Sequence, residues 1–199
     1  MQLDYEFDYY DLYKIHNEAN FLELLSPSPR ILDIYGFCGG STLVEAMASD
    51  LHHKIIPTHG KPPQKELDKL QKNDVKPMNA FTTSEKLQIA LEMAESLADL
   101  HGFEGGTIYH ADTHIEQWLI AFDGSIKLND FNNAKEPLWD EEKSEYCLRY
   151  SGYGGVWRSP EEFRESSQDE SVDTYAFSNN IYTLVSVRRV GLYTTPFLL

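Results

Sequence analysis

The sequence predicts a mixed fold of the α+β class, and three stretches of the chain carry this prediction. Residues 82–98 combine a helix start with apolar residues at helical spacing, residues 117–129 read as two short strands joined by a tight turn, and residues 172–186 read as a buried helix. Apolar residues make up 41% of the 199 residues and aromatic residues 13%, which is typical of a chain that folds around a core.

The helix of residues 82–98 begins with Thr82 and Glu85, whose spacing allows a capping box, in which each side chain accepts a hydrogen bond from the other residue's backbone N–H. An apolar stripe at helical spacing follows, and we expect it in the core. Its members are Leu87, Ala90, Leu91, Ala94, Leu97 and Ala98. The chain then passes a glycine-containing turn and reads as a strand at residues 107–109, which ends at His110.

Two aspartates bracket the predicted hairpin. Its strands, residues 117–120 and 125–129, are joined by Asp123–Gly124, a dipeptide favoured in two-residue hairpin turns. Asp112 precedes the first strand, and Asp130 follows the second. Because the two ends of a hairpin lie side by side, we expect both carboxylates to face a common cleft.

Charge and cysteine content exclude several classes of partner. A net charge of −15 disfavours nucleic acid and anionic membranes. Cys38 and Cys147 provide no disulfide framework, which suits a reducing compartment. No apolar run approaches the roughly 18 residues of a membrane helix, and residues 1–11 are too acidic for a secretory or mitochondrial signal. We therefore expect a cytoplasmic protein with no membrane segment.

Residues 59–77 form a polar insertion that contains five lysines. The insertion is predicted as a solvated loop with a short helix; docking of an acidic partner on its lysines is the alternative. His52, His53 and His59 match no zinc spacing and have no accompanying cysteines, so no zinc site is expected there.

Four segments together resemble the eukaryotic-type protein kinases. His110, Ala111 and Asp112 resemble the catalytic loop, and Asp130 with Phe131 resembles the metal-binding aspartate segment. The segment 158–161 ends 31 residues beyond Asp130 and is similar to the family's Ala-Pro-Glu. Residues 173–178 are similar to the start of the central helix of the large lobe, and the resemblance covers residues 10–186.

The resemblance implies a two-lobed fold. Residues 1–47 would form a partial small lobe, with a regulatory helix at 17–25, a strand ending at Cys38, and a second strand and hinge at 42–47. This lobe is expected to be incomplete, because neither the glycine loop nor the lysine-bearing strand precedes the helix. Residues 48–199 would form a mainly helical large lobe that is truncated at its C-terminal end. Leu22, Ile34, His110 and Phe131 would stack in one column between them.

The resemblance also implies catalytic and metal-binding roles. Asp112 would be the catalytic base, and Asp130 would hold magnesium. His114 stands where the family has a lysine that touches the transferring phosphate, and an imidazole is a weaker and shorter cation. Gln117 replaces the asparagine that serves as second magnesium ligand and is one methylene longer.

Five residues would contact the ATP cofactor. Glu18 falls at the helix glutamate that pairs with the strand lysine, and Glu45 and Met47 lie in the hinge, whose backbone would bind adenine. Gln117 and Leu119 complete this set.

The function implied is ATP- and magnesium-dependent phosphoryl transfer to hydroxyls of a protein substrate, serine or threonine rather than tyrosine. A pseudokinase, which binds a protein partner without catalysis, is the alternative, because the glycine loop and lysine strand are missing and His114 and Gln117 replace family residues. A small-molecule kinase of the aminoglycoside or choline type ranks last, because it does not explain residues 159–161 together with Asp173.

Overall fold

The computed structural model describes residues 9–55, 79–147, 155 and 157–185 of the chain. Within these residues, helices and small antiparallel sheets are mixed along the chain, which confirms the α+β class. The polar insertion predicted at residues 59–77 and the stretch 187–199 lie outside the described residues. Among the described helices, none is both long and apolar enough to cross a membrane.

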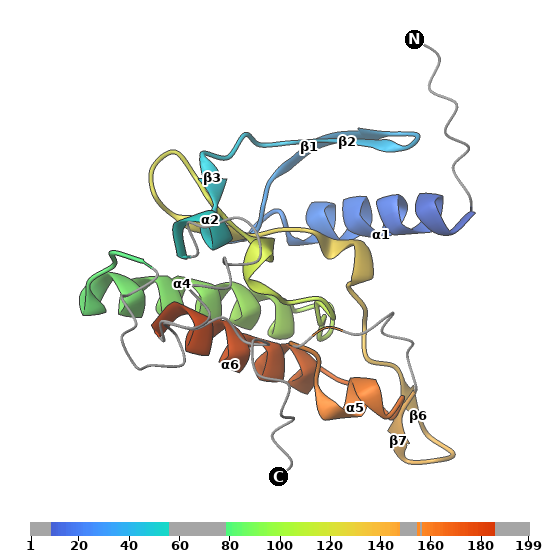
Figure 1. Cartoon of the computed structure of the whole chain (residues 1–199). Coiled ribbons are helices and arrows are strands. Elements are labelled where there is room, and N and C mark those ends of the chain that lie inside the picture. Colours follow the sequence, from blue (N-terminus) through green and yellow to red (C-terminus); the bar gives the residue numbers. More distant parts are fainter. Residues whose placement is uncertain (1–8, 56–78, 148–154, 156, 186–199) are drawn as a thin grey trace, which may run out of the picture.

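Helix α1 (Tyr9–Leu25) is followed by an antiparallel hairpin of strands β1 (Ile34–Cys38) and β2 (Ser41–Val44). Gly39 in the turn between the strands has a φ of +58°, a left-handed conformation that glycine adopts without a steric cost. The helix runs beneath this hairpin (Figure 1). The helix and the two strands expected in this region are confirmed, and the helix extends further toward the N-terminus than residue 17.

A second sheet contains β3 (Ser49–Asp50), β4 (Trp118–Ile120) and β5 (Ile126–Leu128), in that order and all antiparallel. The predicted hairpin is therefore confirmed. In its turn, Asp123 Oδ1 accepts hydrogen bonds from the backbone N–H and the hydroxyl of Ser125. The short helix α2 (Leu51–Ile55) follows β3, and the 3₁₀ turns η1 (Ile115–Gln117) and η2 (Phe131–Asn133) flank β4 and β5.

Helix α4 (Thr83–His101) begins at the predicted capping box, and both of its hydrogen bonds are present. The buried face of α4 differs from the predicted stripe. Leu87 and Leu91 are 67% and 51% exposed, so their assignment to the core is wrong. The buried positions are Ile89, Met93, Ser96, Leu97 and Leu100, so of the predicted stripe only Leu97 is confirmed as buried.

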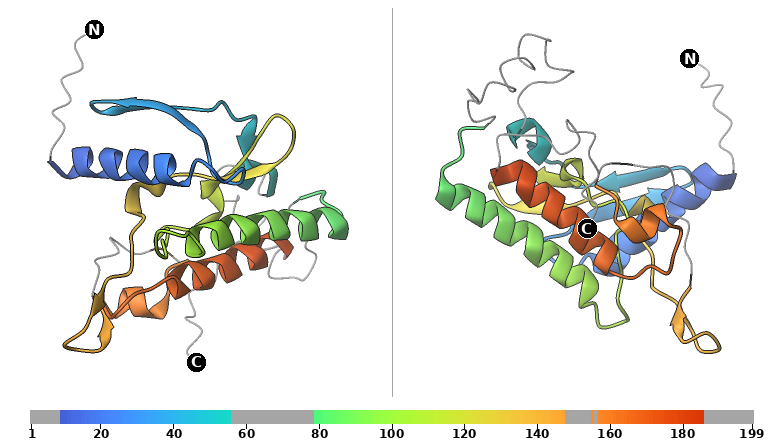
Figure 2. Two further views of the ribbon diagram at one scale, coloured as in Figure 1. Left: turned by 180° about the vertical axis from the view of Figure 1, so that it is seen from behind. Right: turned by 60° about the horizontal axis from the view of Figure 1, so that its bottom comes forward.

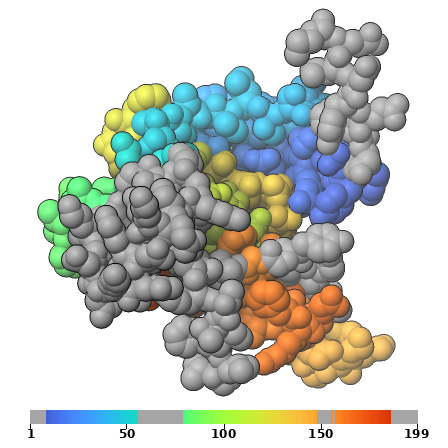
Figure 3. Space-filling model, viewed as in Figure 1, coloured from blue at the N-terminus to red at the C-terminus, as the bar shows by residue number. Residues whose placement is uncertain are grey.

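Helix α6 (Ser171–Val185) confirms the last predicted helix and lies alongside α4 (Figure 2). The short helix α5 (Pro160–Phe163) precedes it and carries its own capping box between Ser159 and Glu162. Strands β6 (Trp139–Asp140) and β7 (Glu145–Tyr146) form a separate hairpin, which projects beyond α5 at the edge of the molecule (Figure 3).

The main hydrophobic core joins α1, α4, α6 and the β4–β5 hairpin. Leu22 and Phe131 are fully buried in it, and Ile34 packs against it from β1. The ring centroid of His110 lies 5.0 Å from that of Phe131. The four residues predicted to form one column therefore gather in and beside the same core.

Candidate functional site

The loop of residues 110–113, which precedes the β4–β5 hairpin, is held by a buried carboxylate. Asp173, on α6, is fully buried and accepts hydrogen bonds from the backbone N–H groups of His110 (2.6 Å) and Ala111 (3.0 Å). Thr113 Oγ1 donates to it at 2.6 Å, and His101 Nε2 lies 3.1 Å away. Burial alone would raise the pKa of Asp173, but the hydrogen bond from His101 and those from the loop hold this pKa below its usual range.

Two non-glycine residues of the site have left-handed backbones. The φ of Ala111 is +60° and that of Asp130 is +64°. Such conformations cost free energy in residues with a Cβ atom, and they persist where surrounding contacts impose them. Ala111 is held by Asp173 from one side and by Arg158 Nη1, which donates to its carbonyl at 2.9 Å, from the other.

Asp112, the predicted base, lies where its own loop, η2 and residues 157–158 come together. Its Oδ2 accepts a hydrogen bond from Asn133 Nδ2 of η2 at 3.0 Å. Its Oδ1 accepts from Trp157 Nε1 and from Arg158 Nη2, each at 3.3 Å. The carboxylate is 17% exposed, so it is oriented by these donors while remaining open to solvent.

Asp130, the predicted metal ligand, stands at the start of η2 with both oxygens in use. Gln117 Nε2 donates to its Oδ2 at 3.0 Å, and Asn132 Nδ2 donates to its Oδ1. The Oδ1 atom of Asn132 is buried and has no donor among the described residues. An oxygen acceptor without a donor, next to a carboxylate, is a suitable ligand for a hard cation such as magnesium.

The predicted residues His114 and Gln117 connect to Asp130 in a chain. Gln117 Nε2 also lies 3.1 Å from His114 Nε2. Burial lowers the pKa of His114, although Asp112 and Glu116 partly oppose this, so the imidazole is neutral at pH 7 and its Nε2 can accept the amide hydrogen. As the Gln117 amide stands, its NH₂ group faces Asp130. The Gln117 amide would have to rotate by half a turn to offer its oxygen to a metal ion at Asp130.

Glu18 reaches the same site from α1. Burial and the nearby charge of Asp130 raise the pKa of Glu18 to about 6. The neighbouring Asn17 explains how the helix is held there. Its Nδ2 lies 3.0–3.2 Å from the backbone carbonyls of Phe131, Asn132 and Ala134. The structure thus brings Glu18 to Asp130 without an ion pair to Lys or Arg among the described residues.

The three remaining predicted residues lie around the link between β2 and β3. The Glu45 carboxylate receives Lys127 Nζ at 2.5 Å and the backbone N–H of Asp33 at 3.0 Å. Burial works against the charged form of Lys127, but Glu45 and Asp33 outweigh it and raise this pKa. Met47 packs against the core, and Leu119 faces Lys127 across β4 and β5. No contact between this link and Asp112 or Asp130 joins the two groups in the described residues.

Sequence reasoning missed Asn133, Trp157 and Lys127, and it noted Arg158 only as part of a motif. These residues lie between 21 and 82 positions from the carboxylates that they contact. Their only signal in the sequence was a tryptophan and an arginine directly before a Ser-Pro-Glu helix start.

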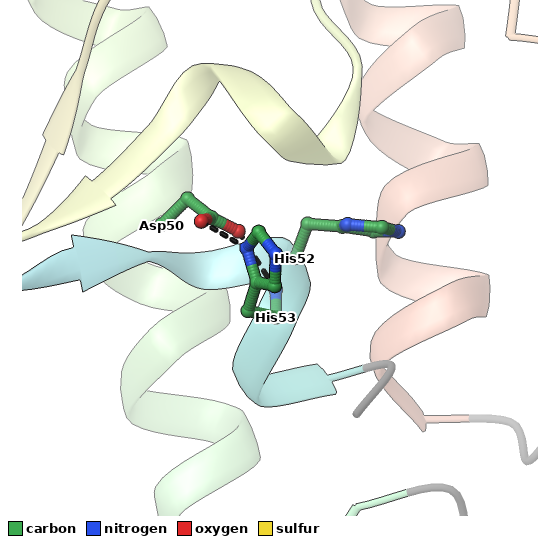
Figure 4. A group of neighbouring side chains, drawn as sticks. All are labelled: Asp50, His52 and His53. Carbon is green, nitrogen blue, oxygen red and sulfur yellow. Dashed lines mark hydrogen bonds and ion pairs between the residues drawn. The ribbon is translucent and has the colours of Figure 1, made fainter. Parts of the chain in front are cut away.

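A second cluster, Asp50, His52 and His53, lies at the start of α2 (Figure 4). It borders the site through Glu116, whose carboxylate oxygens lie 3.7 Å from His52 Nδ1 and 3.9 Å from His114 Nδ1. Asp50 accepts from the backbone N–H of His53 at 2.8 Å and contacts its ring, whereas the His52 ring points away from that carboxylate. Their candidate ligand atoms lie within 4.8 Å of one another, but ligands of one tetrahedral zinc ion are only about 3.4 Å apart. The Asp50–His53 contacts are those of a helix cap.

No protein-family model matches the chain, and no curated protein matches it significantly. The functional proposal therefore rests on the residues and contacts above.

Proposed function

We propose that the chain is a protein kinase-like domain that transfers the γ-phosphoryl group of ATP to hydroxyls of a protein substrate, serine or threonine rather than tyrosine. One observation carries this proposal: Asp112 and Asp130 stand at the two ends of a single hairpin, each carboxylate accepts side-chain hydrogen bonds, and a left-handed backbone lies at Asp130 and directly before Asp112.

Asp112 has the properties of a group that orients a hydroxyl. An ionised carboxylate can accept about four hydrogen bonds. The described residues supply three donors to it, which leaves room for one more from a substrate. Phosphoryl transfer needs mainly positioning and charge neutralisation, so a carboxylate fixed in this way suits the reaction.

Asp130 and Asn132 fit a magnesium ion that accompanies ATP. Magnesium prefers oxygen ligands, and the carboxylate and the unpaired Oδ1 of Asn132 lie in the same turn. When bound, magnesium would neutralise charge on the phosphates. Gln117 could join only after its amide has turned, so Asn132 is the better second oxygen in this arrangement.

The arrangement of elements supports a two-lobed interpretation. Helix α1 and the β1–β2 hairpin lie on one side, and α4, α5 and α6 lie on the other (Figure 1). In this proposal residues 1–47 form the small lobe, which lacks a glycine loop and a lysine-bearing strand. Residues 48–199 form the large lobe.

A pseudokinase is the second candidate, and Glu18 is the observation that favours it. Glu18 stands where the protein kinases have the glutamate that pairs with a strand lysine, and among the described residues neither Lys nor Arg forms an ion pair with it; burial and then Asp130 raise its pKa to about 6. His114 adds no positive charge at pH 7, because burial lowers its pKa. Nucleotide would then be bound weakly, and the fold would serve to hold a partner.

Two substitutions distinguish the candidates. Asp130→Asn should abolish magnesium-dependent nucleotide binding, because the amide keeps the shape but loses the charge that holds the cation. Asp112→Asn should leave nucleotide binding nearly intact and remove transfer of labelled phosphate from ATP to a generic protein. If the unaltered protein transfers no phosphate with magnesium or manganese, the scaffold is the better interpretation.

A further inference from the structure

Several positions near the base hold no cation that contacts it. Position 111 is alanine, and the ring nitrogens of His114 lie beside Gln117 (3.1 Å) and Glu116 (3.9 Å). Lys127 is buried and bound to Glu45. Positive charge near the hydroxyl that receives a phosphoryl group favours the transfer, in addition to the charge of the metal ion.

Arg158 is the cation that the fold brings there. It is 8% exposed, and it lies between the loop that holds Asp112 and the first turn of α5. Its Nη2 donates to Asp112 Oδ1 at 3.3 Å, and its Nη1 donates to Ala111 O at 2.9 Å and to Glu162 Oε1 at 2.8 Å. A planar guanidinium can serve three acceptors at once, whereas an ammonium on a flexible stem holds such a geometry poorly.

Glu162 explains why Arg158 stays in this position. The same carboxylate caps α5, because its Oε2 accepts the backbone N–H of Ser159 at 2.7 Å, and it is 4% exposed. Trp157, the residue before Arg158, donates a hydrogen bond to Asp112, and its ring centroid lies 4.8 Å from that of His114. The start of α5 therefore delivers two adjacent side chains to one carboxylate.

We propose that Arg158 is the positioning residue of Asp112: from the position directly before the N-cap of α5, it fixes the carboxylate and places a positive charge beside it. This role rests on the proposed function. This role makes the packing of residues 157–162 on the loop of Asp112 a condition for activity. Movement of α5 would then release the Asp112 carboxylate without altering Asp130.

The test compares Arg158→Lys with a matched control, Arg164→Lys, in the whole 199-residue chain. Arg158→Lys keeps the charge but loses the three-acceptor geometry, and we expect kcat to fall roughly ten- to hundredfold, the effect of one charge-assisted hydrogen bond, while KM for Mg-ATP changes by less than about twofold. Arg164→Lys makes the same substitution at an exposed arginine directly after α5, so kcat should stay within about threefold of the unaltered protein. Equal kcat in Arg158→Lys and the unaltered protein, or an equal loss in both variants, would overturn the proposal.

Thermal unfolding supplies a readout that does not depend on catalysis. If Arg158 holds Asp112, the loss in Tm of the double variant Asp112→Asn/Arg158→Lys should be smaller than the sum of the two single losses. The losses of Asp112→Asn and Arg164→Lys should add, because Arg164 is exposed and lies outside this network. Absence of phosphoryl transfer in the unaltered protein would refute the proposed function, and the double variant would still decide whether Arg158 positions Asp112. If the Tm losses of Asp112→Asn and Arg158→Lys add in the double variant, Arg158 does not position Asp112 and the proposal is wrong.

Discussion

Glu18 is the residue whose environment has the clearest consequence for pH dependence. Its pKa is raised from 4.5 to about 6, first by burial and then by the charge of Asp130. A carboxyl group with a higher pKa in the folded state binds protons more readily when folded. Its contribution to stability is therefore present at low pH, declines as the pH rises from 4.5 to about 6, and is absent above that range.

Glu18→Gln should remove this dependence, because an amide of nearly the same shape carries no charge. Relative to the unaltered protein, the variant should gain in Tm at about pH 7.5 and gain little at about pH 4.5, where the folded carboxyl is already protonated. Glu23→Gln is the control, since Glu23 is exposed on the same helix. A Tm difference between Glu18→Gln and the unaltered protein that is the same at both pH values would contradict the assignment.

Among the elements, those determined by neighbouring residues were predictable and their packing faces were not. The capping box of α4 and the Asp123–Gly124 turn depend on contacts within a few positions, and both are as expected. The buried face of α4 depends on its neighbours in space. The helix has two apolar stripes, one through Leu87 and Leu91 and one through Ile89 and Met93, and the fold buries the second. Helical spacing alone fits both.

Met93→Ala and Leu91→Ala test this choice of face. Met93 is fully buried, so its truncation should cost about 2–5 kcal/mol of the free energy of unfolding through lost burial and a cavity. Leu91 is half exposed, so its truncation should cost less than about 1 kcal/mol. Denaturant unfolding of both variants measures the difference. Equal losses would mean that the two stripes are buried alike.

At the scale of the whole molecule, the candidate site is assembled from segments far apart in sequence. Asp112 and Asp130 were predictable because a hairpin brings its own ends together. Trp157 and Arg158 were not, because only the path of the chain into α5 places them 45 and 46 residues from the carboxylate that they contact. Asp173 was expected to begin a helix; that it also holds the loop through two backbone N–H groups follows from the packing of α6 beside α4.

Asn17 connects the two sides of the molecule across this site. Its side-chain amide lies within 3.0–3.2 Å of three backbone carbonyls in and after η2, directly beyond Asp130. Helix α1 also packs against η2 through the common core. The position of α1, and with it the position of Glu18, is therefore coupled to the backbone that carries the predicted metal ligand.

Asn17→Ala should weaken both stability and the metal site. The substitution leaves partly buried carbonyls without their donor, which should cost about 1–3 kcal/mol of the free energy of unfolding. Because these carbonyls belong to the turn that follows Asp130, magnesium-dependent nucleotide binding should weaken as well, and calorimetric titration with Mg-ATP measures this loss. Asn20→Ala is the matched control, since Asn20 is exposed on the same helix and should alter neither quantity appreciably. If Asn17→Ala lowers stability but leaves nucleotide affinity equal to that of Asn20→Ala, the helix and the metal-binding turn are not coupled, and α1 acts only as a support for the core.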